Sequence, residues 1–382
     1  MRTRLLFVVR SLIRAGVERT ALTLSDHFEH PGRTHFLALM EGHGDLIAQA
    51  RRPGRLLVPR VMTRHIPGRE DLLFIARSMA RHPCYCMRLR SLLRRVRPHL
   101  LFTHSGVDML AVGALTPRGR IPWVAGVGSD ALAGIAQVHP HLRPFFRAFL
   151  ATLYPLPDRL VAASLGLRQV LLDHYGLSPE RVTVIPNPVD QRVVLEQARA
   201  PLPKESPEGY VLGVGRLVAG KGFDLLLRAF ARTSLRERLV LLGEGPERPG
   251  LLRLASELGV ADRVDMPGSD PNPFRYMARA RAVVVTSRSE GFGNILLEAM
   301  TCGAPVVAFD NHGPRDLIRP GVDGELVGTG DVEALGRALQ DLLASPERLR
   351  ALSLAGRERA RDYSAERICG RYSQLFTEVL GR

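Results

Sequence analysis

Short apolar runs alternate with helical patterns along almost the whole chain. Residues 5–9 form an apolar strand pattern, and residues 21–28 then place their apolar side chains on one helical face. Further strand patterns in the first half occur at residues 36–40, 100–103, 123–127, 160–163 and 182–185. Strands that alternate with helices form a parallel sheet that is covered by helices on both faces. The sequence therefore predicts an α/β fold of the doubly wound type.

This pattern is interrupted once and then starts again. Pro186-Asn187-Pro188 ends the last strand of the first half, and a linker-like stretch follows at residues 201–209. Strand patterns return at residues 210–214, 239–242, 264–266, 282–286 and 305–308, with helical patterns between them. A chain of 382 residues is also too long for one ordinary core. We therefore expect two Rossmann-like domains, residues 1–188 and 189–364, and a terminal helix at 365–382 within a tail that is helical by pattern from 346 to 381.

Positive charge is concentrated in the first half of the chain. Residues 1–188 contain 26 Arg and 12 Asp plus Glu, a difference of +14, so the second half contributes only the remaining +1 of the net charge of +15. Between Asp71 and Asp108 there are several arginines and no acidic residue. Such a surface attracts anionic lipid head groups, polyphosphates or nucleic acid. We expect the first domain to contact an anionic membrane surface, whereas nucleic acid is disfavoured because the sequence has no RNA-binding or zinc-finger motif.

The sequence contains neither an apolar run near the roughly 20 residues of a membrane span nor the features of a secretion signal. The four cysteines lack metal-type spacing, which favours reduced thiols in the cytosol. We expect a cytoplasmic protein that lies peripherally on the inner face of the cytoplasmic membrane.

A glycine-rich segment with two basic residues follows the strand pattern at 210–214. It contains Gly215-Arg216, Lys221-Gly222 and Asp224. Glycines let backbone N–H groups approach a phosphate, and a helix N-terminus adds partial positive charge. Lys221 is one of only two lysines in the chain, which suggests a need for a compact point charge. The spacing fits neither a Walker A loop nor the G-x-G-x-x-G dinucleotide motif, so a diphosphate site of another kind is the hypothesis, and a plain β–α turn is the alternative.

A second segment, Glu290-Gly291-Phe292-Gly293-Asn294, follows the strand pattern at 282–286 and leads into a helical pattern at 295–301. Glu290 and Glu298 are eight positions apart, about two helical turns. This spacing predicts two carboxylates on a similar face, one of them at the mouth of the helix. The sequence neighbours of Glu298 are apolar, so its carboxylate needs a polar partner, and the vicinal hydroxyls of a ribose fit that need.

Residues 290–307, E-G-F-G-N-I-L-L-E-A-M followed by T-C-G-A-P-V-V, resemble the signature of the GT-B-fold retaining glycosyltransferases of family 4. Further matches to the family cover most of the chain, at residues 185–190, 215–217, 221–224, 242–246, 267–268, 272–274, 312–318 and 321–324. The resemblance implies the GT-B fold, in which two Rossmann-like domains face a central cleft and the C-terminal helix crosses back to the first domain.

The resemblance also implies roles for individual residues. Arg216 and Lys221 would hold the diphosphate of a nucleotide-sugar donor and stabilise the leaving group, and Glu290 would contact the sugar hydroxyls. The other donor-binding positions would be Gly215, Met266, Gly268, Gly291, Phe292, Gly293, Asn294 and Glu298, with Glu298 on the ribose and residues 266–268 facing the base. The two cations would replace a divalent metal, so we expect no metal and no cofactor.

The first half departs from the family pattern. Many members show G-G-x-E in the first loop, where this chain has Ala15-Gly16-Val17-Glu18, and many carry a histidine at a position that falls here near Asp130. His104, after the previous strand pattern, is a nearby candidate. Gly16, His104 and Asp130 are therefore the acceptor-side candidates.

The expected function is transfer, with retention, of a hexose or N-acetylhexosamine from a UDP-sugar to a hydroxyl of a lipid-linked, oligosaccharide or polysaccharide acceptor in cell-surface glycan synthesis. A GDP-mannose-dependent mannosyltransferase is the alternative, followed by a nucleotide-sugar epimerase or a phosphorylase on the same fold. A non-catalytic binder is disfavoured by the complete set of donor-site residues. An NAD(P)-dependent oxidoreductase is disfavoured by the lack of G-x-G-x-x-G and by the paired glutamates.

Overall fold

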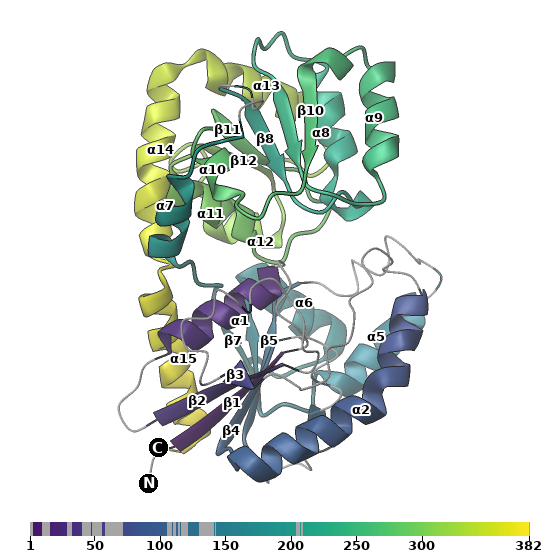
Figure 1. The fold of residues 1–382 in the computed structure, drawn as a ribbon, viewed down its shortest axis with the longest axis vertical. Helices are drawn as coiled ribbons and strands as arrows, with labels where there is room; N and C mark the ends of the chain where they lie inside the picture. Colours follow the sequence, from purple (N-terminus) through teal and green to yellow (C-terminus); the bar gives the residue numbers. More distant parts are fainter. Residues whose placement is uncertain are drawn as a thin grey trace. The chain divides into compact units, whose positions relative to one another are not determined.

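The chain divides into two compact units in the computed structural model (Figure 1). Unit 1 comprises Met1–Pro188 and Ala365–Arg382, and unit 2 comprises Val189–Ser364. The structure describes residues 3–9, 16–28, 33–39, 47, 56–57, 72–104, 109, 112–113, 115, 121–129, 141, 143–203, 207 and 209–381.

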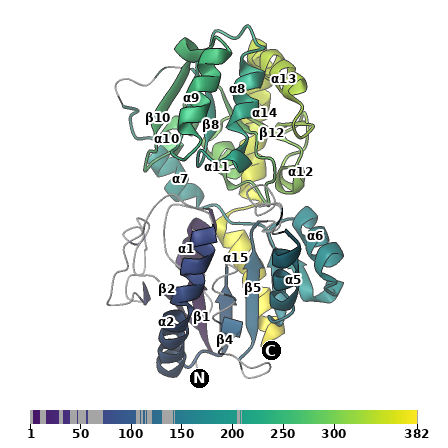
Figure 2. The same cartoon turned by 90° about the vertical axis from the view of Figure 1, so that its right-hand side faces the viewer.

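Unit 1 is built around a parallel sheet (Figures 1 and 2). Its described strands follow the order β3-β2-β1-β4-β5-β6-β7. The strands are β1 (Thr3–Val9), β2 (Arg33–Leu39), β3 (Leu56–Leu57), β4 (Leu100–Thr103), β5 (Trp123–Val127), β6 (Arg159–Ala162) and β7 (Val182–Val184). The helices are α1 (Gly16–His27), α2 (Leu72–Val96), α5 (Arg143–Leu153), α6 (Leu165–Tyr175) and α15 (Ala365–Val379).

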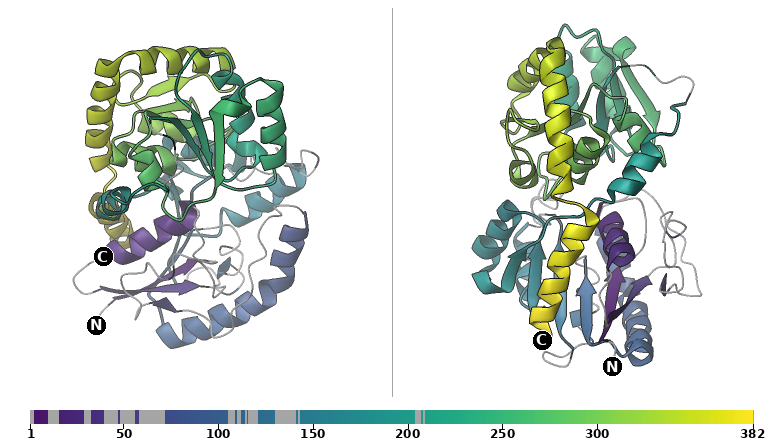
Figure 3. Two further views of the ribbon diagram at one scale, coloured as in Figure 1. Left: turned by 45° about the horizontal axis from the view of Figure 1, so that its top comes forward. Right: turned by 90° about the vertical axis from the view of Figure 1, so that its left-hand side faces the viewer.

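Each face of this sheet carries its own apolar layer, because side chains alternate between the faces along every strand. Phe7 and Phe102 lie on the face covered by α1 and α15, where Phe376 of α15 packs with a ring centroid 5.8 Å from that of Phe102. Leu6 and Val8 lie on the other face, which α2, α5 and α6 cover. The last helix of the chain is therefore part of the core of unit 1, as Figure 3 shows.

Unit 2 has the same kind of architecture. Its described strands are all parallel and follow the order β10-β9-β8-β11-β12-β13. They are β8 (Val211–Val214), β9 (Leu239–Leu242), β10 (Val264–Gly268), β11 (Ala282–Val285), β12 (Val306–Phe309) and β13 (Glu325–Val327). The helices are α7 (Gln191–Ala198), α8 (Phe223–Phe230), α9 (Arg248–Glu257), α10 (Phe274–Met277), α11 (Asn294–Cys302), α12 (His312–Leu317), α13 (Val332–Ala344) and α14 (Pro346–Arg361).

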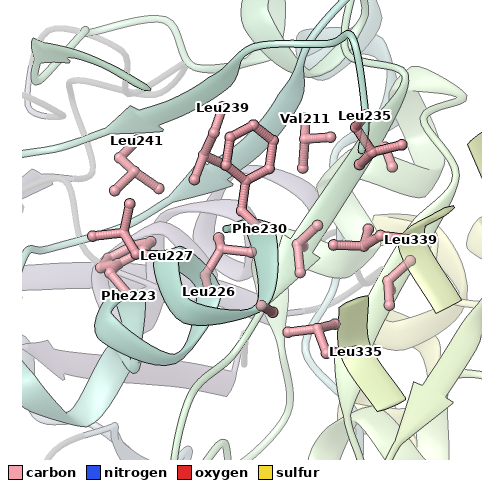
Figure 4. Packing of buried hydrophobic residues seen from close by; sticks show 14 of the residues in the cluster. Val211, Phe223, Leu226, Leu227, Phe230, Leu235, Leu239, Leu241, Leu335 and Leu339 are labelled. Atoms are coloured by element: carbon pink, nitrogen blue, oxygen red, sulfur yellow. The ribbon is translucent and has the colours of Figure 1, made fainter. Parts of the chain in front are cut away.

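The apolar face of α8 fixes one side of the unit 2 core (Figure 4). Phe223, Leu227 and Phe230 recur at helical spacing and pack with Leu239 and Leu241 of β9. The Phe230 side chain is fully buried, and burying one such side chain stabilises the fold by roughly 2–3 kcal/mol. This packing holds the start of α8, and with it the loop after β8, in a fixed position.

The predicted α/β fold is confirmed, and each predicted strand occurs with ends that differ by at most three residues. The tail, which is helical by pattern from 346 to 381, consists of two helices, α14 and α15, and α15 begins at residue 365, where the terminal helix was predicted to begin. Between the two helices, the backbone at residues 363–364 pairs with Val189, whose N–H donates to the carbonyl oxygen of Tyr363 at 2.9 Å.

Candidate functional site

The strand order of the unit 2 sheet reverses between β8 and β11. From β8 the chain moves outward through β9 to β10, and from β11 it moves outward in the opposite direction through β12 to β13. In open parallel sheets, ligands bind beyond the carboxyl ends of the strands at such a reversal. The two segments that the sequence singled out directly follow β8 and β11, so the fold brings them together at this point (Figure 1).

Hydrogen bonds join these two loops. The Thr286 hydroxyl is 3.2 Å from the carbonyl oxygen of Lys221 and 2.9 Å from that of Gly222. Gly222 has φ +64°, and a Cβ at this position would lie only 2.1 Å from the carbonyl oxygen of Thr286. Only glycine therefore allows the two loops to approach this closely.

Lys221 and Glu290 face each other across the loops. Lys221 Nζ lies 2.8 Å from Glu290 Oε2, and the Ser287 hydroxyl donates to the same oxygen at 3.0 Å. The side chains of Lys221 and Glu290 are 33% and 18% exposed. An ammonium has three donors, so Lys221 is able to bind an anion while it contacts Glu290, whose second oxygen is able to accept from a hydroxyl. The pair thus offers a cation and a carboxylate side by side.

The turn after Glu290 leads into α11, which begins at Asn294. Gly291, Phe292 and Gly293 are buried, and Glu298 lies in the middle of the helix with 7% of its surface exposed. Glu290 precedes α11 and Glu298 lies within it, which agrees with the expectation of one carboxylate at the mouth of the helix and one along it. Gly293 has φ +96°, which a right-handed helix does not accommodate, so α11 does not extend back to Glu290.

A third loop, after β12, packs against the same turn. The Asn311 amide donates to the carbonyl oxygen of Ser287 at 2.6 Å, and the Gly313 N–H donates to that of Glu290 at 3.0 Å. A Cβ at Gly313 would lie 2.2 Å from the Phe292 Cα. The ends of three neighbouring strands therefore form one packed loop cluster, and the sequence did not predict the contribution of the third.

The remaining predicted donor residues lie along the carboxyl edge of the sheet. Gly215 follows β8, its N–H donates to the carbonyl oxygen of Leu242 at 3.1 Å, and Arg216 beside it is exposed. Met266 and Gly268 lie at the end of β10. The carbonyl oxygen of Met266 accepts from Arg248 at 2.7 Å, and that of Gly268 accepts from the backbone of Gly243 at 2.8 Å.

Comparison with known proteins assigns both halves of the chain. Residues 14–193 match the family described as Glycosyltransferase Family 4, and residues 195–359 match the one described as Glycosyl transferases group 1. A relative, D-inositol 3-phosphate glycosyltransferase 1 of Catenulispora acidiphila, is 32% identical over 300 residues, which cover 70% of each chain. The chain belongs to glycosyltransferase family 4.

Other relatives of this family 4 member match over shorter segments. A Campylobacter jejuni protein, N-acetylgalactosamine-N,N'-diacetylbacillosaminyl-diphospho-undecaprenol 4-alpha-N-acetylgalactosaminyltransferase, is 30% identical over 220 residues, which cover 57% of this chain and 60% of the relative. The chain spans about 53–60% of the length of this and two other curated relatives.

Solved structures show the fold of the family 4 chain. Sucrose-phosphate synthase of Thermosynechococcus elongatus matches with a TM-score of 0.82 at 21% identity, over 100% of both chains. Anabaena HepE in complex with UDP and glucose matches with a TM-score of 0.75 at 18% identity, over 99% of this chain and 100% of HepE. Together with the two parallel sheets, these likenesses establish the GT-B fold, with two Rossmann-like domains.

The acceptor-side candidates of this glycosyltransferase family member belong to unit 1. Gly16 is the first residue of α1, and Asp130 lies outside the described residues. His104 directly follows β4, where the order of the unit 1 sheet reverses between β1 and β4. Its ring lies over Gly126 of β5, where a Cβ would be 2.1 Å from the imidazole Nδ1.

His104 is buried, with 3% of its surface exposed. Neither ring nitrogen has a hydrogen-bond partner within the described part of the chain. Burial lowers the pKa of the imidazole to about 4, so it is neutral at pH 7. A buried polar group without a partner is rare, and this one lies at the edge of the sheet where parallel folds bind ligands.

Arg288 and Asp224 form an ion pair beside Lys221 that the sequence motifs did not predict. The only sequence signal for this pair was Asp224 itself, and an acidic residue in the first turn of a helix is ordinarily explained by the helix dipole.

The Cys302 thiol lies at the end of α11. Burial and the nearby Glu298 carboxylate raise its pKa to about 12, which keeps it protonated.

The described residues form neither a metal-binding cluster nor a membrane-spanning helix. Among the residues that the structure describes, no group of three or more His, Cys, Asp or Glu side chains is arranged to hold a metal ion. In the same part of this family 4 chain, no helix combines the length and apolarity that crossing a membrane requires.

Proposed function

We propose that the chain is a retaining glycosyltransferase that moves a hexose or an N-acetylhexosamine from a UDP-sugar to a hydroxyl of a lipid-linked, oligosaccharide or polysaccharide acceptor. The observation that carries this proposal is the contact of Lys221 with Glu290 at the reversal point of the unit 2 sheet. A nucleotide-sugar donor presents a diphosphate beside a ring of hydroxyls, and a cation beside a carboxylate is able to bind both groups through charge-assisted hydrogen bonds.

In this proposal, the donor lies along the carboxyl edge of the unit 2 sheet. Lys221 and Arg216 bind the diphosphate, and Glu290 accepts a hydrogen bond from a sugar hydroxyl. Glu298 binds the ribose, and residues 266–268 face the base. The backbone from Gly291 to Asn294 and that of Gly215 contact the sugar and the phosphates.

The proposed reaction takes place on one face of the sugar. The acceptor oxygen bonds to the anomeric carbon while the bond from that carbon to the β-phosphate oxygen breaks. The proton of the acceptor hydroxyl passes to the departing phosphate oxygen. Because the acceptor enters on the face from which the phosphate leaves, the anomeric configuration is retained. Lys221 and Arg216 stabilise the charge that develops on the leaving nucleoside diphosphate, and no divalent metal is required.

The names of similar proteins support this choice of donor and acceptor. HepE of Anabaena has been solved in complex with UDP-glucose. The Campylobacter relative is named for transfer of N-acetylgalactosamine to a saccharide on diphospho-undecaprenol, and a Rhizobium meliloti relative, 35% identical over 184 residues, is named a lipopolysaccharide core biosynthesis glycosyltransferase. These names favour a UDP-sugar and a lipid-linked or lipopolysaccharide-type acceptor for this chain.

On the acceptor side, Gly16, His104 and Asp130 remain the candidates.

We also propose that α2 contacts an anionic membrane surface, the inner face of the cytoplasmic membrane. Exposed side chains of α2 and the residue after it include Met87 with 66% exposure, Arg90 and Arg94 on one stripe, and Arg95 and Arg97 close by. Each arginine near an anionic surface contributes about 1 kcal/mol of binding.

Vesicle flotation tests the membrane contact. We expect the protein to float with vesicles that contain phosphatidylglycerol and not with vesicles of phosphatidylcholine alone. Replacement of Arg90, Arg94 and Arg95 by Gln should weaken flotation at low salt. Equal flotation of the variant and the wild type would contradict a role for this face.

A transfer assay tests the reaction. The protein is incubated with UDP-sugars or GDP-mannose and with undecaprenyl-diphosphate-linked saccharides, in the presence of EDTA. We expect transfer from a UDP-sugar, undiminished by EDTA, with the anomeric configuration of the donor in the product. Transfer from GDP-mannose would establish the alternative donor. An epimerised donor, a sugar phosphate or an inverted product would overturn the proposal.

A further inference from the structure

Arg288 binds both the loop and the helix on either side of Lys221. Its guanidinium forms two parallel hydrogen bonds to the Asp224 carboxylate, at 3.0 and 2.7 Å, in the first turn of α8. The same guanidinium donates to the carbonyl oxygen of Ala219, and the backbone N–H of Arg288 donates to that of Gly220 at 2.9 Å. These bonds hold the residues just before and just after Lys221.

The backbone around Lys221 is fixed from one side. Each carbonyl oxygen from residue 219 to residue 222 accepts a hydrogen bond from Thr286 or Arg288. Both donors lie in the loop after β11, which also carries Glu290. Lys221 lies within residues 219–222. The loop after β11 therefore fixes the backbone from which the Lys221 ammonium extends.

The Arg288–Asp224 pair is better suited to fixing a geometry than to stabilising the whole fold. Both side chains are 35% exposed, and ion pairs with that exposure contribute little to global stability. A two-pronged contact, in contrast, fixes the relative orientation of the two groups. The Arg288 guanidinium is also engaged by both Asp224 carboxylate oxygens and by the carbonyl oxygen of Ala219, so most of its N–H groups are used within the loop cluster.

We propose that Arg288 is a positioning residue, which holds the ammonium of Lys221 where the diphosphate of the donor binds. This inference rests on the proposed function and deepens it. Arg288 acts through Lys221 and Asp224 and does not touch the donor. Its removal therefore affects phosphate binding and turnover, and has no effect in a protein that lacks Lys221.

The test compares UDP affinity, measured by calorimetry, with kcat and KM for sugar transfer. We expect Arg288→Ala to reduce kcat/KM on the order of 10- to 100-fold, because a small displacement of a catalytic group has effects of this size. Asp224→Ala should reproduce the loss. Arg288→Lys should recover only part of the activity, since an ammonium cannot make the two-pronged contact. In a Lys221→Ala background, further removal of Arg288 should change kcat/KM by less than about twofold.

The pair formed by Arg238 and Asp265 is a matched control. It has the same two-pronged geometry, at 2.6 and 2.9 Å, and nearly the same exposure, 40% and 33%. Arg238 directly precedes β9, so the pair lies at the amino-terminal edge of the sheet, away from the loop cluster. Arg238→Ala should leave UDP affinity and turnover within about twofold of the wild type.

Two results would overturn the positioning role. One is normal UDP affinity and turnover in Arg288→Ala and Asp224→Ala, as in the Arg238→Ala control. The other is a loss that multiplies with that of Lys221→Ala, which would mean that Arg288 acts on the donor independently. Urea unfolding midpoints identify any variant that fails to fold, and Arg288→Lys then provides the test. A wild type that binds no nucleoside diphosphate and transfers no sugar would instead contradict the proposed function.

Discussion

The ammonium of Lys221 lies 2.8 Å from a carboxylate oxygen of Glu290, although 69 positions separate the two residues in the sequence. Each charge partners the other at a site that is partly shielded from water. In the proposed function, a diphosphate contacts the ammonium and a sugar hydroxyl contacts the carboxylate. Donor binding then exchanges one set of polar partners for another, so neither group is left buried without a partner.

Replacement of Lys221 by alanine should reduce kcat severely. The side chain supplies positive charge beside the departing phosphate, and loss of one such electrostatic contact typically costs about 100- to 1000-fold in kcat. Lys221→Arg should recover only part of the activity, because the planar guanidinium does not reproduce a compact ammonium. Steady-state kinetics of sugar transfer measure the effect, and near-normal turnover by Lys221→Ala would refute the assignment.

Replacement of Glu290 by glutamine should separate nucleotide binding from transfer. The variant removes the negative charge that competes for Lys221, so free UDP should bind about two- to fivefold more tightly at low salt, the range expected for a partly exposed ion pair. Sugar transfer should nevertheless fall, because the carboxylate no longer accepts from the sugar. Calorimetric titration with UDP at two salt concentrations checks the binding. Weaker UDP binding by Glu290→Gln would contradict this account.

The strands and the loops after β8 and β11 were predictable because their signals are local. Apolar runs such as residues 123–127 and 239–242 are confirmed at the predicted residues. Glycines mark the loops after β8 and β11. The resemblance then supplied the fold, which the comparisons confirm. The approach of Lys221 to Glu290 follows from the strand order β8-β11, since adjacent parallel strands end at the same edge.

The contacts that the sequence missed depend on backbone geometry at distant positions. Arg288 meets Asp224 across 64 positions, and the approach of Gly313 leaves no room for a Cβ beside the backbone of Phe292, so neither contact has a local pattern. Whether the Glu290 and Glu298 side chains share a face also depends on backbone geometry, because the left-handed Gly293 lies between Glu290 and the start of α11. The acceptor side stays a prediction, with Asp130 outside the described residues.

Replacement of Gly222 by alanine should destabilise unit 2. The residue has φ +64°, and a Cβ there would lie 2.1 Å from the carbonyl oxygen of Thr286. The strained backbone costs about 1 kcal/mol, and the clash should add at least as much again. Gly259→Ala is the matched control, because Gly259 has φ +68° and a Cβ there would have no neighbouring atom within 4 Å. Urea unfolding of both variants isolates the clash, and equal destabilisation would show that the loops separate freely.

Burial of His104 should make stability depend on pH. Its folded pKa is lowered from 6.5 to about 4. The unfolded chain therefore takes up this proton near pH 6.5, whereas the folded protein does not until about pH 4. The stability that the neutral imidazole confers is present above pH 6.5 and is lost as the pH falls towards 4. Between pH 7 and pH 5, this one group should lower the free energy of unfolding by about 2 kcal/mol.

A comparison of the wild type with His104→Leu measures this contribution, because other titrating groups affect both proteins alike. Leucine also removes two buried nitrogens that lack partners among the described residues, so the variant should be at least as stable as the wild type at pH 7. Urea unfolding at pH 7 and pH 5 should then show a smaller loss of stability in the variant. An equal loss in both proteins would mean that water or a charge reaches the imidazole in the folded protein.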